Sequence, residues 1–185
     1  MTLEENTSVL LLIDIQEKLF AAIHDRERLK KNVELLVRLC QIMNIPLLVT
    51  EQYPKGLGKT IPTLIHLLQK EYFPIEKTTF SCFAHEIFVH KLDTLFNRGR
   101  RHLIVCGIET HICVYQTVRD LHRHREWTLH VAADATGART EFNWRWGLEL
   151  LREEGASIKP TETLLYELLK EAGTPTFKAM LPFIK

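Results

Sequence analysis

Short apolar runs alternate with helical patterns along this whole chain, and that alternation constrains the fold more than any other feature. The runs carry few charges, which is typical of strands buried on both faces of a sheet. Strands are predicted at 9–15, 46–50, 74–77, 102–106, 128–133 and 156–159. Helices are predicted at 28–43, 61–69, 86–98, 111–123, 142–155 and 161–172, the last with Thr161 as its cap.

Repeated strand–helix alternation with short links indicates a parallel sheet covered by helices on both faces. Right-handed crossovers and one reversal of winding give a strand order near 3-2-1-4-5-6. The sequence therefore predicts an α/β fold, a three-layer sandwich with a six-stranded parallel sheet. A single domain is expected over residues 1–185. Ligands of such folds bind beyond the carboxyl ends of the strands.

Charge and cysteine content narrow the function classes. Lys plus Arg number 24 against 23 Asp plus Glu, so nothing overall favours a polyanionic partner. The acidic start MTLEENTSV does not look like a signal peptide, and the run VLLLI is broken by Asp14 and too short to span a bilayer. The cysteines at 40, 82, 106 and 113 show no disulfide-rich spacing. Reduced thiols in the cytoplasm, with no membrane association, are expected.

Polar residues stand at the ends of three predicted strands. Asp14 lies in the first strand, Lys77 ends the third, and Cys113 follows the fourth in GIETHICV. Taken singly, each has an ordinary interpretation: a structural carboxylate, a solvated lysine and a packed thiol. Together they supply what thiol catalysis requires, because a helix start and an ammonium group favour a thiolate and a carboxylate can accept its proton.

The segments LLIDIQEKLF, TEQYPKGLGKT, EKTTFSCF and VCGIETHICVYQTVRDL resemble the isochorismatase-like hydrolase superfamily, also called the cysteine hydrolases. The resemblance is closest to its poorly characterised branch of isochorismatase-domain proteins. It implies the six-stranded α/β sandwich, with Asp14 as general base, Lys77 as the group that holds the base, and Cys113 as nucleophile. It also implies a cis peptide between Ile108 and Glu109, an oxyanion hole from the N–H groups of Glu109 and Cys113, and a thioester intermediate.

Three differences from relatives bear on the chemistry. Nicotinamidase-type relatives carry a metal-binding D-x-H…H motif where this chain has TEQYPKGLG, so no metal and no cofactor are expected. Isochorismatase itself hydrolyses a vinyl ether without a cysteine nucleophile, so Cys113 favours cleavage of a C–N bond. Glu109 places a carboxylate beside the oxyanion hole, where it either recognises a cationic substrate or faces away.

The surroundings of this site carry weaker signals. Phe20, Gln52, Tyr53 and Phe80 are candidates for the substrate pocket, although Phe20 and Phe80 fit core packing equally well. GLGKT lacks the first glycine of a phosphate-binding loop and is interpreted as a flexible loop over the cleft. The apolar tail GTPTFKAMLPFIK either docks on its own domain or reaches a neighbouring subunit of an expected homo-oligomer.

These observations predict a metal-independent cysteine hydrolase that acts on a small amide-like substrate. A different class of function is also consistent with them: an oligomeric interaction protein with a vestigial or redox-sensitive Cys113. Nuclease or RNA-binding activity is disfavoured, because the basic stretches 97–102 and 121–127 are better explained as solvated helix ends in a chain of net charge +1.

Overall fold

The computed structural model describes residues 3–124 and 126–184, and its centre is one parallel β-sheet. The strands are β1 (Ser8–Ile13), β2 (Leu47–Gln52), β3 (Ile75–Lys77), β4 (His102–Ile108), β5 (Thr128–Gly137) and β6 (Ser157–Lys159). Their spatial order is β3-β2-β1-β4-β5-β6, with every pair parallel. The predicted α/β class and strand order are confirmed.

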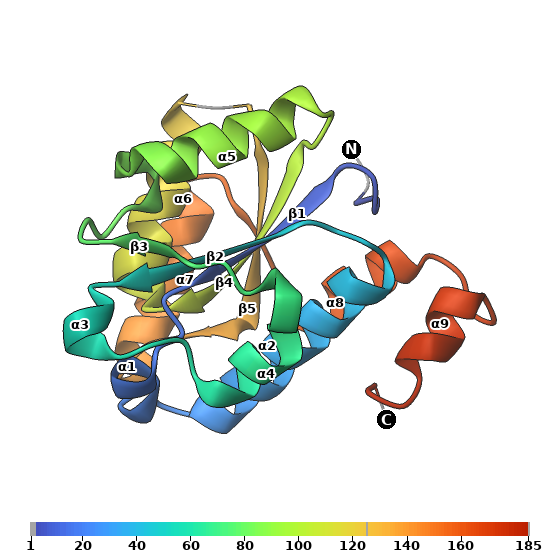
Figure 1. The fold of residues 1–185 in the computed structure, drawn as a ribbon, viewed down its shortest axis with the longest axis horizontal. Helices are drawn as coiled ribbons and strands as arrows, with labels where there is room; N and C mark the ends of the chain where they lie inside the picture. The colour runs from blue at the N-terminus through green and yellow to red at the C-terminus, as the bar shows by residue number, and fades with distance from the viewer. Residues whose placement is uncertain (1–2, 125, 185) are drawn as a thin grey trace.

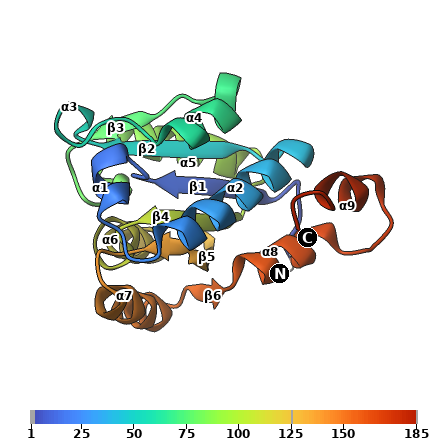
Figure 2. The same ribbon diagram turned by 90° about the horizontal axis from the view of Figure 1, so that it is seen from below.

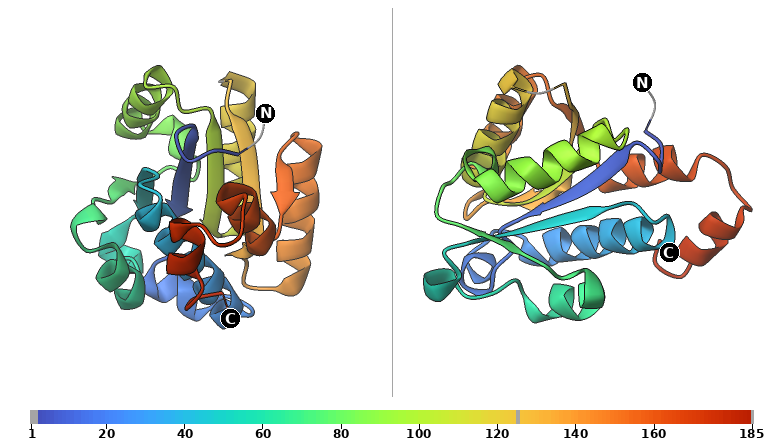
Figure 3. Two further views of the ribbon diagram at one scale, coloured as in Figure 1. Left: turned by 90° about the vertical axis from the view of Figure 1, so that its right-hand side faces the viewer. Right: turned by 45° about the horizontal axis from the view of Figure 1, so that its top comes forward.

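Helices cover both faces of the sheet, as Figures 1 and 3 show. One face packs against α2 (Arg26–Ile42), α4 (Pro62–Leu68) and α8 (Thr161–Leu169), and the other against α5 (Glu86–Asn97), α6 (Tyr115–His124) and α7 (Glu141–Glu153). Alternate residues of β1 enter the two cores: Leu10 and Leu12 join the first, Val9 and Leu11 the second. This two-sided burial explains why the strand is a continuous apolar run.

The close approach of β1 and β4 depends on Gly107. Its φ is +126°, and a Cβ added there would lie 2.1 Å from the carbonyl oxygen of Ile13. The register of β4 with β5 shifts between Val105 and Gly107, and β5 continues to Gly137, past the end predicted at residue 133. The extension of β5 depends on its backbone pairing with β4, and such pairing leaves no periodic signal in the sequence. The extension was therefore not predicted.

Several short elements were also not predicted. They are α1 (Glu17–Ala21), α3 (Pro54–Leu57), α9 (Pro175–Met180), and the turns η1 (Gln69–Glu71), η2 (Cys82–Ala84) and η3 (Thr110–Val114). The turn η3 is π-helical and precedes α6, where the sequence predicted one continuous helix. Thr161 is the first residue of α8 rather than its cap, because its N–H and hydroxyl both donate to Asp134 on β5.

The C-terminal tail docks on its own chain. Met180 of α9 is fully buried, and the guanidinium of Arg38 on α2 lies 4.3 Å from the ring centroid of Phe183. Figure 2 shows α9 at the end of the molecule opposite α1 and α3. Within residues 3–124 and 126–184, no helix is long and apolar enough to cross a membrane.

Candidate active site

The fold brings Asp14, Lys77 and Cys113 to the same edge of the sheet. Asp14 directly follows β1 with a left-handed φ of 54°, a conformation that Asp tolerates better than most residues. Lys77 is the last residue of β3, and Cys113 lies in η3, which follows β4. Since β1 and β4 are neighbours across the reversal of winding, this is the edge where parallel α/β folds bind ligands.

Asp14 and Lys77 form a fully buried ion pair. Lys77 Nζ lies 2.6 Å from Asp14 Oδ2, and neither side chain is exposed. The same Nζ donates to Gln52 Oε1 at 2.8 Å and to the carbonyl oxygens of Thr79 at 3.1 Å and Phe80 at 3.3 Å. Burial alone would lower the pKa of Lys77, but the Asp14 carboxylate, together with Cys82 and Cys113, outweighs burial and the pKa is raised. Lys77 is therefore charged, and its N–H bonds are all engaged by these acceptors.

Cys113 is almost buried, with 6% of its surface exposed, and its thiol interacts electrostatically with Asp14. Burial and the negative charge of Asp14 raise the pKa of Cys113 above its ordinary range, while the charge of Lys77 lowers it by less. The sequence led us to expect surroundings that favour the thiolate. In the structure, burial first and the Asp14 carboxylate second favour the protonated thiol instead.

Two side chains from β2 complete this cluster. The Thr50 hydroxyl donates to Asp14 Oδ1 at 2.7 Å, and the amide of Gln52 donates to the Thr78 carbonyl at 2.7 Å while accepting from Lys77. Gln52, a predicted pocket residue, is therefore one of the groups that hold the ammonium of Lys77. Sequence reasoning missed Thr50. The only signal in the sequence was that Thr50 and Gln52 lie on one face of a strand that ends at the same edge, and this does not give the partner of Thr50.

Glu109 follows a cis peptide bond with Ile108 and points toward Arg139. Its Oε2 accepts from both the backbone N–H and the Nε of Arg139, each at 3.1 Å. Only 7% of the Glu109 side chain is exposed, against 59% for Arg139. The carboxylate is thus compensated within the chain rather than left free for a cationic substrate.

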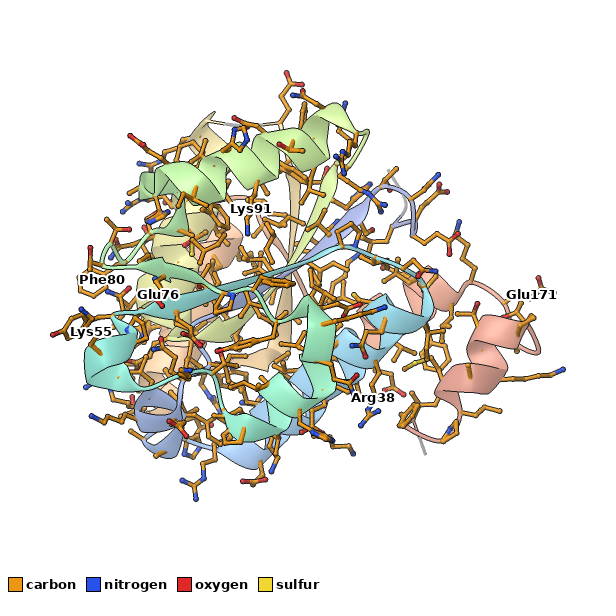
Figure 4. The ribbon with its side chains drawn as sticks, viewed as in Figure 1. Arg38, Lys55, Glu76, Phe80, Lys91 and Glu171 are labelled. Carbon is orange, nitrogen blue, oxygen red and sulfur yellow. The ribbon has the colours of Figure 1, made fainter. Side chains whose placement is uncertain are left out.

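The predicted aromatic pocket residues lie in different surroundings. Tyr53 and Phe80 are about half exposed, at 53% and 55%. Figure 4 shows Phe80 at the edge of the molecule. Phe20, on α1, instead packs, partly buried, against the core that includes α2.

The loop that contains GLGKT, which the sequence suggested is flexible, forms hydrogen bonds with neighbouring segments. Gln16 Nε2 donates to the carbonyl oxygens of Gln52 at 2.9 Å and Gly58 at 2.6 Å. The buried carboxylate of Glu51 accepts from the backbone N–H and hydroxyl of Thr60.

Among residues 3–124 and 126–184, no three His, Cys, Asp or Glu side chains are grouped so as to hold a metal ion.

Comparison with known proteins identifies the family of this chain. Residues 8–163 match the model of the isochorismatase domain. The chain is 37% identical over 172 residues to isochorismatase domain-containing protein 2 of Danio rerio, covering 92% of this chain and 83% of the relative. A structure described as the MAR1 ribonuclease of Caenorhabditis elegans is 31% identical, with a TM-score of 0.89 and coverage of 100% and 92%.

A more distant structure has the same fold. The YcaC gene product of Escherichia coli, described as an octameric hydrolase of unknown specificity, is 22% identical with a TM-score of 0.87, over 98% of this chain and 92% of its own. The match to the domain model covers most of the sequence, and the Danio rerio relative is well above 30% identical over nearly the whole chain. The chain belongs to the isochorismatase family.

Proposed function

We propose that this chain is a metal-independent cysteine hydrolase that cleaves the C–N bond of a small amide-like substrate through a thioester. The observation that carries the proposal is the position of Asp14, whose carboxylate lies 2.6 Å from Lys77 Nζ and also interacts with the thiol of Cys113. A thiol that interacts with a fixed carboxylate has a candidate proton acceptor beside it, which is the arrangement of an activated nucleophile.

The first half of the reaction follows from these contacts. The Asp14 carboxylate accepts the Cys113 proton as the sulfur attacks the substrate carbonyl carbon, so an S–C bond forms and the carbonyl π bond opens. The oxyanion accepts hydrogen bonds from the backbone N–H groups of Glu109 and Cys113. When the tetrahedral intermediate collapses, the C–N bond breaks and Asp14 returns its proton to the leaving nitrogen.

The second half hydrolyses the thioester. Asp14, again ionised, accepts a proton from water as the water oxygen attacks the thioester carbon, and the thiol of Cys113 leaves with that proton. Lys77 acts throughout by its charge and by holding Asp14, because its N–H bonds already serve Asp14, Gln52 and two backbone carbonyls. No step calls on a metal or an organic cofactor.

A second candidate function comes from a relative. The Caenorhabditis elegans structure that shares 31% of this sequence is described as a ribonuclease. The arginines on and next to α7 are held in ion pairs here: Arg139 with Glu109, and Arg145 with Glu141 at 2.6 Å. The chain as a whole carries 24 Lys plus Arg against 23 Asp plus Glu, which does not favour a polyanion, so a small-molecule substrate is the better proposal. RNA binding by the pure protein that weakens with salt would favour the second candidate.

The biological setting is also a proposal. We expect a cytoplasmic homo-oligomer, and the octameric state in the description of the Escherichia coli structure supports the oligomer. The four cysteines are free in the structure, which supports a reducing compartment. One relative, 31% identical, is described as a secreted effector of Phytophthora sojae, so expression with and without a secretion route is the direct check.

The test is the rate at which each cysteine is alkylated as a function of pH, measured by peptide mass mapping. If Asp14 accepts the Cys113 proton, Cys113 reacts at a rate that is constant over several pH units and falls on the acidic side when Asp14 is protonated. Asp14→Asn abolishes that plateau, and the rate then follows an ordinary titration of the thiol. Lys77→Met slows Cys113, because the cation that favours the thiolate is lost.

Buried Cys106 provides the internal control, since burial raises its pKa without a carboxylate partner. Cys106 should be alkylated slowly in all three proteins, and its alkylation rate should rise steadily with pH. If Cys113 behaves like Cys106 and ignores both substitutions, the hydrolase proposal fails. An oligomeric interaction protein with a vestigial or redox-sensitive cysteine would then be the better description.

A further inference from the structure

Strand β2 lies between the strands that carry the base and the lysine. Thr50 is the register partner of Ile13 on β1, and Gln52 is the register partner of Lys77 on β3. Thr50 is fully buried and lies beside Asp14. The backbone N–H of Asp14 donates to the carbonyl oxygen of Thr50 at 3.2 Å. The side chain of Thr50 thus occupies a fixed place next to the Asp14 carboxylate.

The two oxygens of Asp14 have different partners. Oδ2 faces Lys77 Nζ at 2.6 Å, whereas Oδ1 accepts from the Thr50 hydroxyl at 2.7 Å. Cys82 Sγ lies 3.8 Å from the Thr50 oxygen and donates to it. The titratable groups facing Asp14 are therefore Lys77 from β3, Cys113 from η3 and, through Thr50, Cys82 from η2.

These partners differ in what they can do when Asp14 gains a proton. An ammonium group has only donors, so Lys77 cannot accept from a carboxylic acid. A hydroxyl is both donor and acceptor and rotates to suit its neighbour. If the proton of Cys113 moves to Oδ1, one S–H bond breaks, one O–H bond forms, and the Thr50 oxygen can accept that O–H. Oδ1 is therefore the oxygen that keeps a partner in both protonation states.

We propose that Thr50 is a positioning residue of the Asp14 base: its hydroxyl fixes the carboxylate against Lys77 and provides the partner for the proton that Asp14 takes from Cys113. This inference rests on the proposed function, because it assumes that Asp14 is the acceptor of the thiol proton. Thr50 itself does not touch the reacting sulfur in this scheme and acts only through Asp14.

The experiment is the pH profile of Cys113 alkylation in Thr50→Val, which keeps the shape of the side chain and removes the hydroxyl. Donation to the charged carboxylate is the stronger of the two hydrogen bonds, so its loss favours the protonated form. The acidic limb of the profile should move up by about one pH unit, the shift that one hydrogen bond to a charged group represents. Thr50→Ser should restore the wild-type limb.

Thr161 offers a matched control. It is also fully buried, and its hydroxyl also donates to a carboxylate oxygen, Asp134 Oδ1, at 2.7 Å. Thr161→Val therefore removes the same kind of bond from α8 and should leave the alkylation profile of Cys113 unchanged. Thr50→Ala repeats the loss of the hydroxyl at lower side-chain volume in case the valine variant does not fold.

The possible results separate this inference from the function on which it rests. A wild-type profile without a plateau or acidic limb would defeat the proposed function itself. A wild-type limb that stays in place in both Thr50→Val and Thr50→Ala would overturn the role of Thr50 and leave the proposed function intact. Movement of the limb in Thr161→Val as well would show a general loss of stability, and would also overturn it.

Discussion

The ammonium nitrogen of Lys77 lies 2.6 Å from Oδ2 of Asp14, and neither side chain is exposed to solvent. Removing only one member of a buried ion pair destabilises the fold, because the other charge then stays buried without a counterion. We expect Lys77→Met to lower the free energy of unfolding by about 3–5 kcal/mol. Urea titration followed by far-UV circular dichroism measures this loss.

The double variant Asp14→Asn with Lys77→Met removes both charges and serves as the control. Asn tolerates the left-handed backbone at position 14, so it introduces little strain of its own. The double variant should be more stable than Lys77→Met alone, with a coupling free energy of about 1 kcal/mol or more. Equal stability of the two proteins would mean that the unpaired carboxylate is not the source of the loss.

A second prediction concerns the contact of Gly107 with Ile13. A methyl group at position 107 would lie 2.1 Å from a backbone oxygen, which no side-chain rotation can relieve. We expect Gly107→Ala to destabilise the fold by about 3 kcal/mol or more, because steric overlap adds to the unfavourable φ of +126°. Thermal and urea unfolding both report it.

Gly99→Ala isolates the backbone contribution. Gly99 also has a positive φ, of +89°, but an added Cβ there would meet nothing within 4 Å. The expected loss is about 1–2 kcal/mol, the usual penalty for a left-handed residue with a Cβ. If both alanine variants lose the same free energy, the contact between β1 and β4 is not the constraint on position 107.

The sequence allowed the architecture to be predicted because each layer has its own periodicity. The apolar run of β1 and the helical spacing of α2 come directly from two-sided and one-sided burial. The short helices α1 and α3 could not be predicted, because five and four residues carry no resolvable period. They are fixed by long-range hydrogen bonds, such as that from Gln16 to the carbonyl of Gly58.

The site was predictable only in its chemistry. Asp14, Lys77 and Cys113 could be selected because strand ends converge at one edge and because of the family resemblance. The role of Thr50 depends on the register of β2 against β1, which no spacing in the sequence reveals. Glu109 pairs with Arg139, which follows shortly after the end of β5. This pairing therefore depends on the extension of β5 to Gly137, which the sequence did not reveal.

The pairing of Arg139 with Glu109 gives a third prediction. The Glu109 side chain is nearly buried, but Arg139 is mostly exposed and the backbone N–H of residue 139 remains as a donor. Arg139→Ala should therefore cost only about 1 kcal/mol of unfolding free energy, at the upper end for pairs with an exposed member. Arg145→Ala breaks an exposed pair with Glu141 and should cost about 0.3–0.5 kcal/mol. A larger loss for Arg145→Ala would contradict the ranking.

The last prediction concerns two buried histidines at the opposite end of the sheet. His102 Nδ1 lies 3.1 Å from His130 Nε2, and both residues are at most 4% exposed. Burial, together with the charge of Lys159 and the neighbouring His102, lowers the pKa of His130 to about 4 from 6.5. Burial also lowers the pKa of His102. Both imidazoles are therefore neutral in the folded protein near neutral pH.

The sign of the effect follows from proton linkage. As pH falls, the unfolded chain protonates His130 near pH 6.5, whereas the folded protein does so only near pH 4. The stability that the neutral imidazole contributes is therefore complete above pH 6.5. It declines as the pH falls from 6.5 to about 4, and it is lost below about pH 4. The change from this group alone should reach about 3 kcal/mol, since each pH unit corresponds to about 1.4 kcal/mol.

Urea unfolding between pH 4 and pH 7.5 tests this directly, with His130→Gln as the informative variant. Glutamine cannot take up the proton, so the slope of unfolding free energy against pH in this window should become shallower than in the wild type. His90→Gln changes an exposed histidine on α5 and is the matched control, expected to keep the wild-type slope. If the His130→Gln protein keeps that slope as well, the buried pair is not what makes the fold sensitive to acid.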